Sequence, residues 1–327
     1  MCDPDPATAM KISPILWQTG RGSSLYAHNG PRATRTLREF HAHLQLEGIS
    51  PTFHNDSRAR ALISRHCPYA LQAYDCLRPP SYRADLWRYC ALYTFGGWFL
   101  DAEDLPLVPL PSLHRTCDTL LLVRDQCPGP DDSTATMPCK VLAVQISFMA
   151  AVPRHPFFAC CLAMAVRNIE QHVHGRNDLD LTGPVLAGAC LRKLHAETNY
   201  SMTLTLAADP SRNSWQPRKA LYLEDGSTIA LRLHAWDARH ASNGTRANGY
   251  VDYARAWTKQ GAFRKECQPA RRRAPAAAAT RIVANGTTVT SARHASRAAF
   301  ERLSEAVERE GLRAATDDAW RRSEFVD

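Results

Sequence analysis

The chain has 327 residues, of which 45% are hydrophobic, and it carries a formal net charge of +8. This length fits one large domain or one domain with an appendage, and the hydrophobic content is sufficient for a buried core. No apolar run is long enough to span a membrane, and the N-terminus lacks the hydrophobic stretch of a secretory signal, so the sequence predicts a cytoplasmic protein without a membrane span.

The cysteines and the basic charge point to no particular chemistry. Eleven cysteines are scattered without a Cys-x-x-Cys pair, which predicts reduced thiols and argues against a zinc site. Asn-x-Ser/Thr sequons begin at Asn55, Asn199, Asn243 and Asn285, and without an entry signal we expect them to remain unmodified. Nucleic-acid binding is an alternative for a chain of this charge, but no aromatic and basic recognition platform is visible, so no nucleic-acid partner is predicted.

The N-terminal part of the chain predicts alternating strands and helices. Ile12–Thr19 is a short apolar strand that ends in a polar turn, and Thr34–Leu46 has the apolar spacing of a helix. Pro51–Asp56 predicts a second strand, and Arg58–Tyr74 predicts a second helix.

The central stretch, Ser81–Pro106, organises the rest of the chain. A helix with Ser81 as its predicted N-cap runs to Gly96 and Gly97, which break it. Trp98–Leu100 then predicts a short buried strand. An acidic cluster follows at the carboxyl end of that strand, which is where open α/β sheets bind ligands.

Two polar groups in this stretch each allow two interpretations. Asp85 and Arg88 share one helical face, so they form either a surface ion pair or part of a ligand site. Asp101, Glu103 and Asp104 form either a solvated loop or a site for a hard cation. The fixed order of ion pair, Gly-Gly, strand and acidic cluster favours the ligand site for both groups.

The remaining sequence continues the strand and helix pattern. Thr182–Pro184, a Thr-Gly-Pro sequence, precedes a predicted helix; it represents either ordinary helix-start chemistry or a place where helix amides meet a ligand. The other predicted elements are an edge strand and turn over Leu105–Leu113, strands over Thr119–Val123, Val141–Val152 and Ile229–Trp236, two strands within Thr203–Leu223, and helices over Phe157–Gln171 and Tyr250–Phe263.

The alternation predicts an α/β fold with a mixed central sheet flanked by helices, over residues 1–265. The composition then changes to a Pro/Ala/Arg-rich linker over 266–297. An amphipathic helical tail is expected over 298–327, where it would pack on the domain or bind a partner.

The central motif resembles the sugar-binding region of DXD-motif glycosyltransferases. The helix of Ala84–Tyr89, the Gly-Gly break, the strand of Trp98–Leu100 and the acidic run of Asp101–Asp104 follow the pattern of glycosyltransferase family 32 and its relatives, the capsular polysaccharide synthesis proteins and clostridial glucosylating toxins. Glu103 stands where the family usually has its second Asp, and Asp104 is a substitute ligand. The resemblance covers roughly Ile12–Phe263 as short matches, and it implies a GT-A-like nucleotide-sugar-binding fold.

The resemblance implies roles for residues in the first strand and the central helix. Trp17 would stack on the nucleobase of the donor, and a core tryptophan is the alternative. Asp85 would accept hydrogen bonds from sugar hydroxyls, and Arg88 would orient the sugar or a phosphate.

Further donor-binding residues are implied in the C-terminal half. Thr182 and Gly183 would meet the sugar or phosphate. His234 and Trp236 are the candidates for a segment that closes the site over the diphosphate and the metal. No catalytic nucleophile or base is assigned.

The implied cofactor is a divalent cation, Mn²⁺ or Mg²⁺, because the ligands are oxygen atoms. Asp101, with Glu103 or Asp104 and with His234, would hold the cation against the diphosphate. The predicted function is metal-dependent, retaining transfer of a hexose from a nucleotide sugar, with a UDP-sugar favoured, to a glycan or protein acceptor. A catalytically degenerate nucleotide-sugar-binding or scaffold protein of the same fold is the alternative.

Overall fold

The computed structural model describes residues 12–20, 31–102, 104–106, 108–113, 118–124, 143–173, 175, 177–197, 203–206, 220–222, 228–232 and 261–267. Its strands are β1 (Ile15–Thr19), β2 (Ser50–His54), β3 (Gly97–Leu100), β4 (Asp104–Pro106), β5 (Leu120–Arg124), β6 (Val144–Ala151), β7 (Thr203–Leu206), β8 (Ala220–Tyr222) and β9 (Thr228–Arg232). Its helices are α1 (Pro31–Leu46), α2 (Asp56–His66), α3 (Leu71–Cys76), α4 (Pro80–Phe95), α5 (Pro156–Glu170) and α6 (Pro184–Glu197), with 3-10 turns at Pro68–Ala70, Leu110–Leu113 and Lys265–Cys267.

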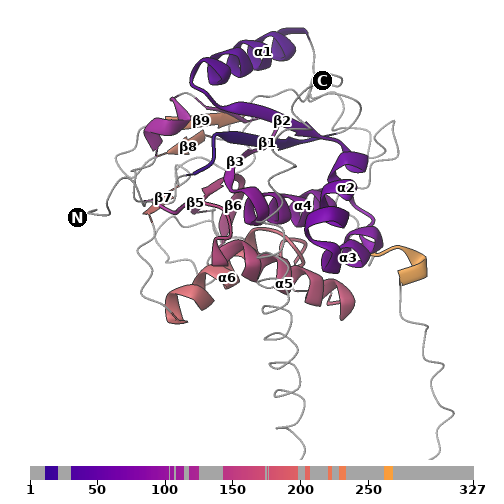
Figure 1. The fold of residues 1–327 in the computed structure, drawn as a ribbon. Coiled ribbons are helices and arrows are strands. Elements are labelled where there is room, and N and C mark those ends of the chain that lie inside the picture. Colours follow the sequence, from indigo (N-terminus) through magenta and orange to yellow (C-terminus); the bar gives the residue numbers. More distant parts are fainter. Residues whose placement is uncertain are drawn as a thin grey trace, which may run out of the picture.

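The main sheet has six strands in the order β2-β1-β3-β6-β5-β7 (Figure 1). β2, β1 and β3 run parallel, whereas β6 runs antiparallel to both of its neighbours, β3 and β5. A second sheet, β4-β9-β8, is antiparallel. The main sheet is therefore mixed and flanked by helices, which confirms the predicted α/β class with a mixed central sheet.

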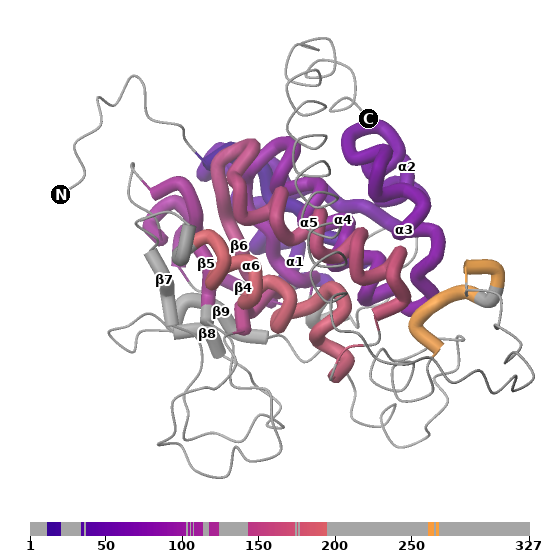
Figure 2. Tube along the Cα trace, turned by 90° about the horizontal axis from the view of Figure 1, so that it is seen from below, coloured from indigo at the N-terminus to yellow at the C-terminus, as the bar shows by residue number. Residues whose placement is uncertain are grey.

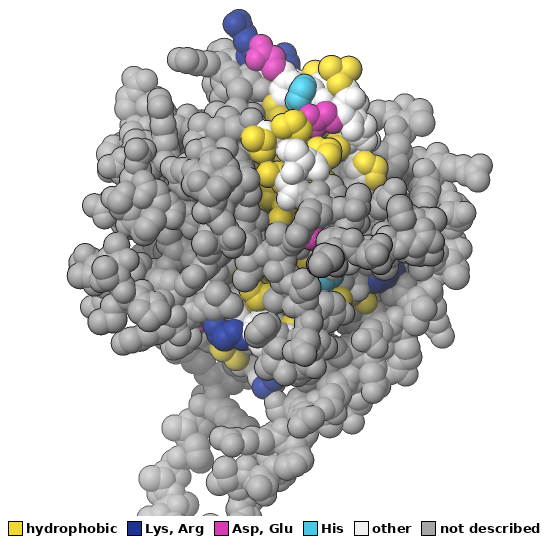
Figure 3. Space-filling view, turned by 90° about the vertical axis from the view of Figure 1, so that its left-hand side faces the viewer, with side chains coloured by type: hydrophobic (Ala, Val, Ile, Leu, Met, Phe, Trp, Pro, Cys, Tyr) yellow, Lys and Arg dark blue, Asp and Glu magenta, His cyan; other side chains and the backbone are white. Residues whose placement is uncertain are grey.

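Helices cover both faces of the main sheet. α1 lies over one face, and α4, α5 and α6 lie over the other (Figure 1). Successive side chains of a strand point to opposite faces, so Leu16 and Trp98 enter the core beneath α1, while Trp17 and Phe99 enter the larger core around α4 and α5. Figure 3 shows α1 at the top of one side of the molecule, with charged side chains on its outer surface.

α4 is the central helix of the fold, and eleven of its residues are buried. It starts at Pro80, after an N-cap at Pro79 that makes no side-chain capping bond. The prediction of Ser81 as N-cap is therefore wrong, because a proline fits the first helical turn, where a backbone N–H needs no helical partner. Burial on all sides means that polar residues of α4 must find partners inside the protein.

Gly96 and Gly97 join α4 to β3 through positive φ angles of 65° and 93°. A Cβ atom on Gly96 would lie 2.6 Å from the backbone nitrogen of Pro153, and one on Gly97 would lie 2.6 Å from the carbonyl oxygen of Ile15. Only glycine allows this close approach. The glycine pair thus lets β3 lie directly against β1 and fixes where the end of β3 stands relative to α4.

Two disulfides overturn the prediction of reduced thiols for four of the cysteines. Cys67–Cys90 joins the end of α2 to α4, and Cys76–Cys267 joins α3 to the last 3-10 turn, which lies beside α3 in Figure 2. The partners are 23 and 191 residues apart in sequence, so the fold and not a local spacing brings them together. Disulfides persist in oxidising compartments, and the thiol argument therefore no longer supports a cytoplasmic location.

None of the helices in the described part of the chain is long and apolar enough to cross a membrane. Of the helix predicted over Tyr250–Phe263, only residues 261–263 are described, and they are not helical, because Phe263 forms a β-bridge with Leu77 there. The predicted tail over 298–327 and nearly all of the linker lie outside the described residues. The domain boundaries therefore stay predictions.

Candidate active site

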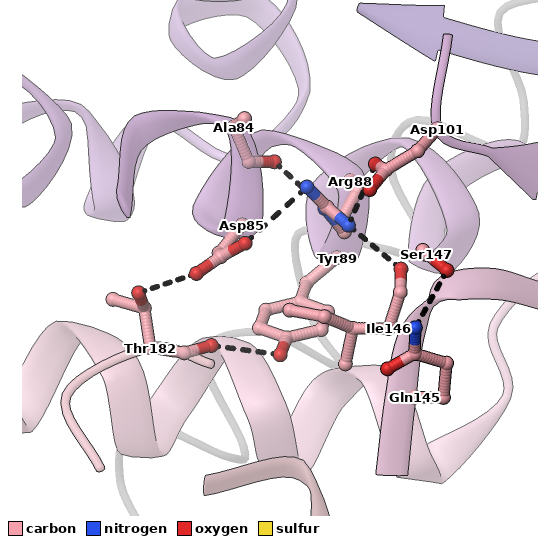
Figure 4. A network of polar contacts seen from close by, with 9 residues as sticks. All are labelled: Ala84, Asp85, Arg88, Tyr89, Asp101, Gln145, Ile146, Ser147 and Thr182. Carbon is pink, nitrogen blue, oxygen red and sulfur yellow. Dashed lines mark hydrogen bonds and ion pairs between the residues drawn. The ribbon is translucent and has the colours of Figure 1, made fainter. Parts of the chain in front are cut away.

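A buried polar network lies where α4, the end of β3, β6 and the start of α6 meet (Figure 4). α4 contributes Asp85 and Arg88, and Asp101 follows β3 directly. The backbone N–H of Asp101 donates to the carbonyl oxygen of Ser147 on β6, over 2.9 Å. The fold therefore brings together the two halves of the motif that the sequence had placed on separate elements.

Arg88 is the centre of this network, and its side chain is 7% exposed. One terminal nitrogen, Nη1, donates to the carbonyl oxygen of Ile146 over 2.7 Å and lies 3.3 Å from Oδ1 of Asp101. The other, Nη2, lies 3.3 Å from Oδ1 of Asp85. The guanidinium carbon also lies 4.2 Å from the ring centre of Phe99, a cation–π contact. Arg88 thus joins both carboxylates, and the interpretation of a surface ion pair is wrong because the pair is buried.

Asp85 is held from two sides. Its Oδ1 faces Arg88, and its Oδ2 accepts a hydrogen bond of 2.8 Å from the hydroxyl of Thr182. Burial raises the pKa of Asp85 to about 7, and Arg88 and the Thr182 hydroxyl act in the opposite direction by favouring the carboxylate. A carboxylate can accept about four hydrogen bonds, so acceptor positions remain for a ligand beyond these two contacts.

Thr182 is fully buried, at 0% exposure. Besides the hydroxyl contact to Asp85, its carbonyl oxygen accepts a hydrogen bond of 2.7 Å from the Tyr89 hydroxyl. Gly183 is also tightly packed, since a Cβ atom there would lie 3.1 Å from the carbonyl oxygen of Leu179. The predicted contact of Thr182 with the donor is therefore indirect in this structure, through Asp85.

Asp101 is the more accessible carboxylate of the network, with a side chain that is 25% exposed. Asp104, the first residue of β4, is 4% exposed, and its backbone N–H donates to the carbonyl oxygen of Asp101. Glu103 lies outside the described residues. Two of the three predicted acidic ligands are thus placed next to each other along one turn.

The carboxylates of this turn suit a hard cation whose coordination shell is completed by oxygen atoms of a bound ligand. No cluster of three or more acidic, histidine or cysteine side chains suited to a metal occurs among the described residues. Mg²⁺ and similar ions commonly take only one or two carboxylates, with phosphate oxygens and water completing the shell. A partly exposed Asp101, backed by Arg88, has the chemistry for that arrangement.

Trp17 occupies the core, where it is 1% exposed. Its indole Nε1 donates to the carbonyl oxygen of Gly96 over 2.8 Å, and its ring contacts those of Phe95 and Trp87. In this structure the ring offers no open face to a nucleobase. His234 and Trp236, the residues predicted to close the site, lie outside the described residues.

Three contacts of the site escaped the sequence analysis. The carbonyl of Ile146 and the ring of Phe99 hold Arg88, and Tyr89 holds Thr182. Tyr89 follows Asp85 by four residues, which places both on one face of α4. This spacing is the only feature of the sequence that points to Tyr89 as part of the site. The backbone contact to Ile146 leaves no trace in the residue type.

Comparison with known proteins supports the resemblance over the central segment. Residues 31–119 match a family model described as the glycosyltransferase sugar-binding region containing DXD motif. No curated protein matches the chain. Among solved structures, PaToxG glycosyltransferase is similar at 14% sequence identity and a TM-score of 0.37, with 57% of this chain and 70% of that chain covered, which is too weak a likeness to support an argument. The matched segment includes Asp85, Arg88 and Asp101, and it confirms the resemblance there; Ile146 and Thr182 lie outside it.

Proposed function

We propose that this protein transfers a hexose from a nucleotide sugar to a glycan or protein acceptor, with a divalent cation and with retention of configuration. A UDP-sugar is the favoured donor. The observation that carries the proposal is the Asp85–Arg88–Asp101 network, which lies within the segment that matches the sugar-binding family. Two carboxylates of different exposure meet at the carboxyl end of a central strand, where ligands of α/β sheets bind.

Each carboxylate has a separate part in this proposal. Asp85 accepts hydrogen bonds from hydroxyls of the donor sugar, because its charge is buried and its orientation is fixed from two sides. Asp101 faces the cation, because it is more exposed and a hard cation brings water ligands with it. Arg88 holds the two carboxylates in register and keeps them apart.

The cation would be Mn²⁺ or Mg²⁺, held by Asp101 with Glu103 or Asp104 and with His234. When bound, such an ion stabilises the negative charge that develops on a leaving diphosphate. We keep Gly183 and Trp236 as candidate donor contacts. Thr182 acts through Asp85, and the proposal does not depend on Trp17, since its ring is covered.

The test is thermal unfolding of the protein with a panel of nucleotide sugars, with and without Mn²⁺. We expect one donor to raise the melting temperature only when Mn²⁺ is present, and Asp101→Ala to lose this response. A ligand at about 100 times its Kd stabilises a protein by roughly 2.7 kcal/mol, which such a scan resolves. Asp75→Ala is the matched control, because Asp75 forms an exposed ion pair with Arg60 away from the network.

A catalytically degenerate nucleotide-sugar-binding or scaffold protein of the same fold is the second candidate. The low exposure of Asp104 favours it, because Asp101 is then the one accessible carboxylate in the described part of the acidic turn. Hydrolysis of the donor in the absence of an acceptor separates the two. Slow, Mn²⁺-dependent release of the nucleotide supports the transferase, and binding without any release supports the scaffold. The absence of a response to every donor contradicts both.

A further inference from the structure

The loop before α6 is attached to α4 by two side-chain hydrogen bonds at a single residue. The Thr182 hydroxyl donates to Oδ2 of Asp85 over 2.8 Å, and the Tyr89 hydroxyl donates to the carbonyl oxygen of Thr182 over 2.7 Å. Asp85 and Tyr89 are one turn apart on α4, so both attachments lie on one helical face (Figure 4). Residue 182 is 97 positions from Asp85 in sequence, so these bonds join two distant parts of the chain.

Neither Thr182 nor Tyr89 can touch a ligand from its place in the structure, because both are 0% exposed. What they contact is Asp85, whose side chain is 10% exposed and which the proposed function assigns to the donor sugar. Their effect on a ligand must therefore pass through the Asp85 carboxylate.

An aspartate carboxylate is free to rotate about its last side-chain bond, since this torsion has broad minima. Arg88 contacts one oxygen, Oδ1, and Thr182 donates to the other, Oδ2. Two donors on different oxygens fix the plane of the group, whereas Arg88 alone would fix only one end. Tyr89 in turn fixes the backbone of residue 182, so that the threonine hydroxyl points at Asp85.

We propose that Tyr89 and Thr182 are positioning residues, which hold the Asp85 carboxylate in the one orientation that accepts the hydroxyls of the donor sugar. This inference rests on the proposed function. It makes sugar recognition by Asp85 depend on two buried hydrogen bonds, from the Tyr89 hydroxyl to the Thr182 carbonyl and from the Thr182 hydroxyl to Asp85, and separates it from the cation contact at Asp101.

The test measures KM, kcat and the half-saturating Mn²⁺ concentration for hydrolysis, without an acceptor, of the nucleotide sugar that stabilises the wild type, in three variants. Thr182→Val keeps the shape and removes the hydroxyl, Thr182→Ser keeps the hydroxyl, and Tyr89→Phe removes only the phenolic oxygen. We expect Thr182→Val, which loses a hydrogen bond to a charged group, to raise donor KM about tenfold, and Tyr89→Phe, which loses one to a neutral carbonyl, to raise it about threefold. Thr182→Ser should restore wild-type KM within about twofold, and the Mn²⁺ requirement should not change in any of them.

A purely structural attachment would behave differently. Ser13→Ala is the control, because the Ser13 hydroxyl donates to the carbonyl oxygen of Phe95 at the other end of α4, over 2.7 Å. It should lower the melting temperature as much as Tyr89→Phe does, without raising donor KM. If Tyr89→Phe and Thr182→Val lower the melting temperature and leave donor KM unchanged, the positioning role is wrong while the proposed function stands.

The binding experiment on the wild type separates the remaining outcomes. If the unaltered protein shows no Mn²⁺-dependent donor response, the proposed function fails, and this inference fails with it. If Thr182→Val does not fold, the comparison of Tyr89→Phe with Ser13→Ala decides the question. An equal effect of those two variants on donor KM overturns the inference.

Discussion

Asp85 and Asp101 each lie 3.3 Å from the guanidinium of Arg88, but their surroundings differ. The Asp85 side chain is 10% exposed and accepts a hydrogen bond from Thr182, while that of Asp101 is 25% exposed at the end of a strand. Burial raises the pKa of Asp85 to about 7. The difference shows how one motif supplies two kinds of acceptor: a buried, oriented carboxylate for hydroxyl groups and a more open one for a hydrated cation.

The largest effect is expected from removal of the group that the two carboxylates share. Arg88→Met leaves Asp85 and Asp101 without their cation, and breaking a buried pair in this way costs about 3–5 kcal/mol of unfolding free energy. Urea unfolding measures the loss. Arg60→Met is the matched control, because its pair with Asp75 is exposed and should contribute about 1 kcal/mol or less. Equal losses in the two variants would contradict the central place of Arg88.

A smaller effect is expected from moving one carboxylate relative to the other. Gly97→Ala places a Cβ atom 2.6 Å from the carbonyl oxygen of Ile15 at a φ of +93°, which must displace β3 and, with it, Asp101. Backbone strain of this kind costs about 1–3 kcal/mol, and we expect donor-dependent stabilisation by Mn²⁺ to fall as well.

Gly48→Ala is the control that separates the effect of backbone strain from the effect of displacing β3. Gly48 also has a positive φ, +76°, but nothing lies within 4 Å of its added Cβ atom. It should lose about 1 kcal/mol of unfolding free energy and keep the full response to donor and Mn²⁺. A loss of that response in Gly48→Ala would show that general destabilisation, and not the position of β3, is responsible.

The smallest expected effect is a pH dependence that only one of the carboxylates produces. Because burial raises the pKa of Asp85 to about 7, the ionised form that accepts hydroxyls is lost as the pH falls below that value. Donor affinity of the wild type should therefore decrease from pH 8 to pH 6, by up to about tenfold per pH unit, and Asp85→Asn should show a flat, weak profile. A decrease of equal slope in Asp85→Asn would assign the titration to another group.

The same shift has a consequence for stability, with the opposite direction. The pKa of Asp85 is raised from 3.8 to about 7 on folding. Between these values the unfolded chain has released the proton and the folded protein still holds it, so the unfolding free energy decreases as the pH rises through this interval. Asp85→Asn removes this term, and urea unfolding at pH 5 and pH 8 should show a smaller pH difference for the variant.

Local features of the site could be predicted from the sequence, and distant contacts could not. The helix, the glycine break and the strand up to Asp101 depend on neighbouring residues, and they lie where the sequence placed them. The contact of Thr182 with Asp85 and the disulfide of Cys76 with Cys267 join segments that only the fold brings together. No rule of sequence spacing connects such pairs. The sequence therefore predicted a direct ligand contact for Thr182 and reduced thiols for the two cysteines.

Trp17 illustrates a second limit. The sequence allowed either a core position or a nucleobase contact, because an aromatic residue at a strand end serves both purposes. The alternation of side chains along β1 directs this residue to the face covered by α4, where its indole N–H is bonded to Gly96. Whether the ring is covered depends on which helices pack on that face of the sheet, and that information is tertiary.

The most direct test of the account compares binding of UDP and of a UDP-sugar, with Mn²⁺, to the wild type, Asp85→Asn and Asp101→Asn by calorimetry. The account predicts that Asp85→Asn binds UDP as the wild type does but loses the additional affinity that the sugar provides. It predicts that Asp101→Asn loses Mn²⁺-dependent binding of both ligands. If both variants lose UDP binding, or if both lose only the additional affinity from the sugar, the division of sugar and cation between the two carboxylates is contradicted.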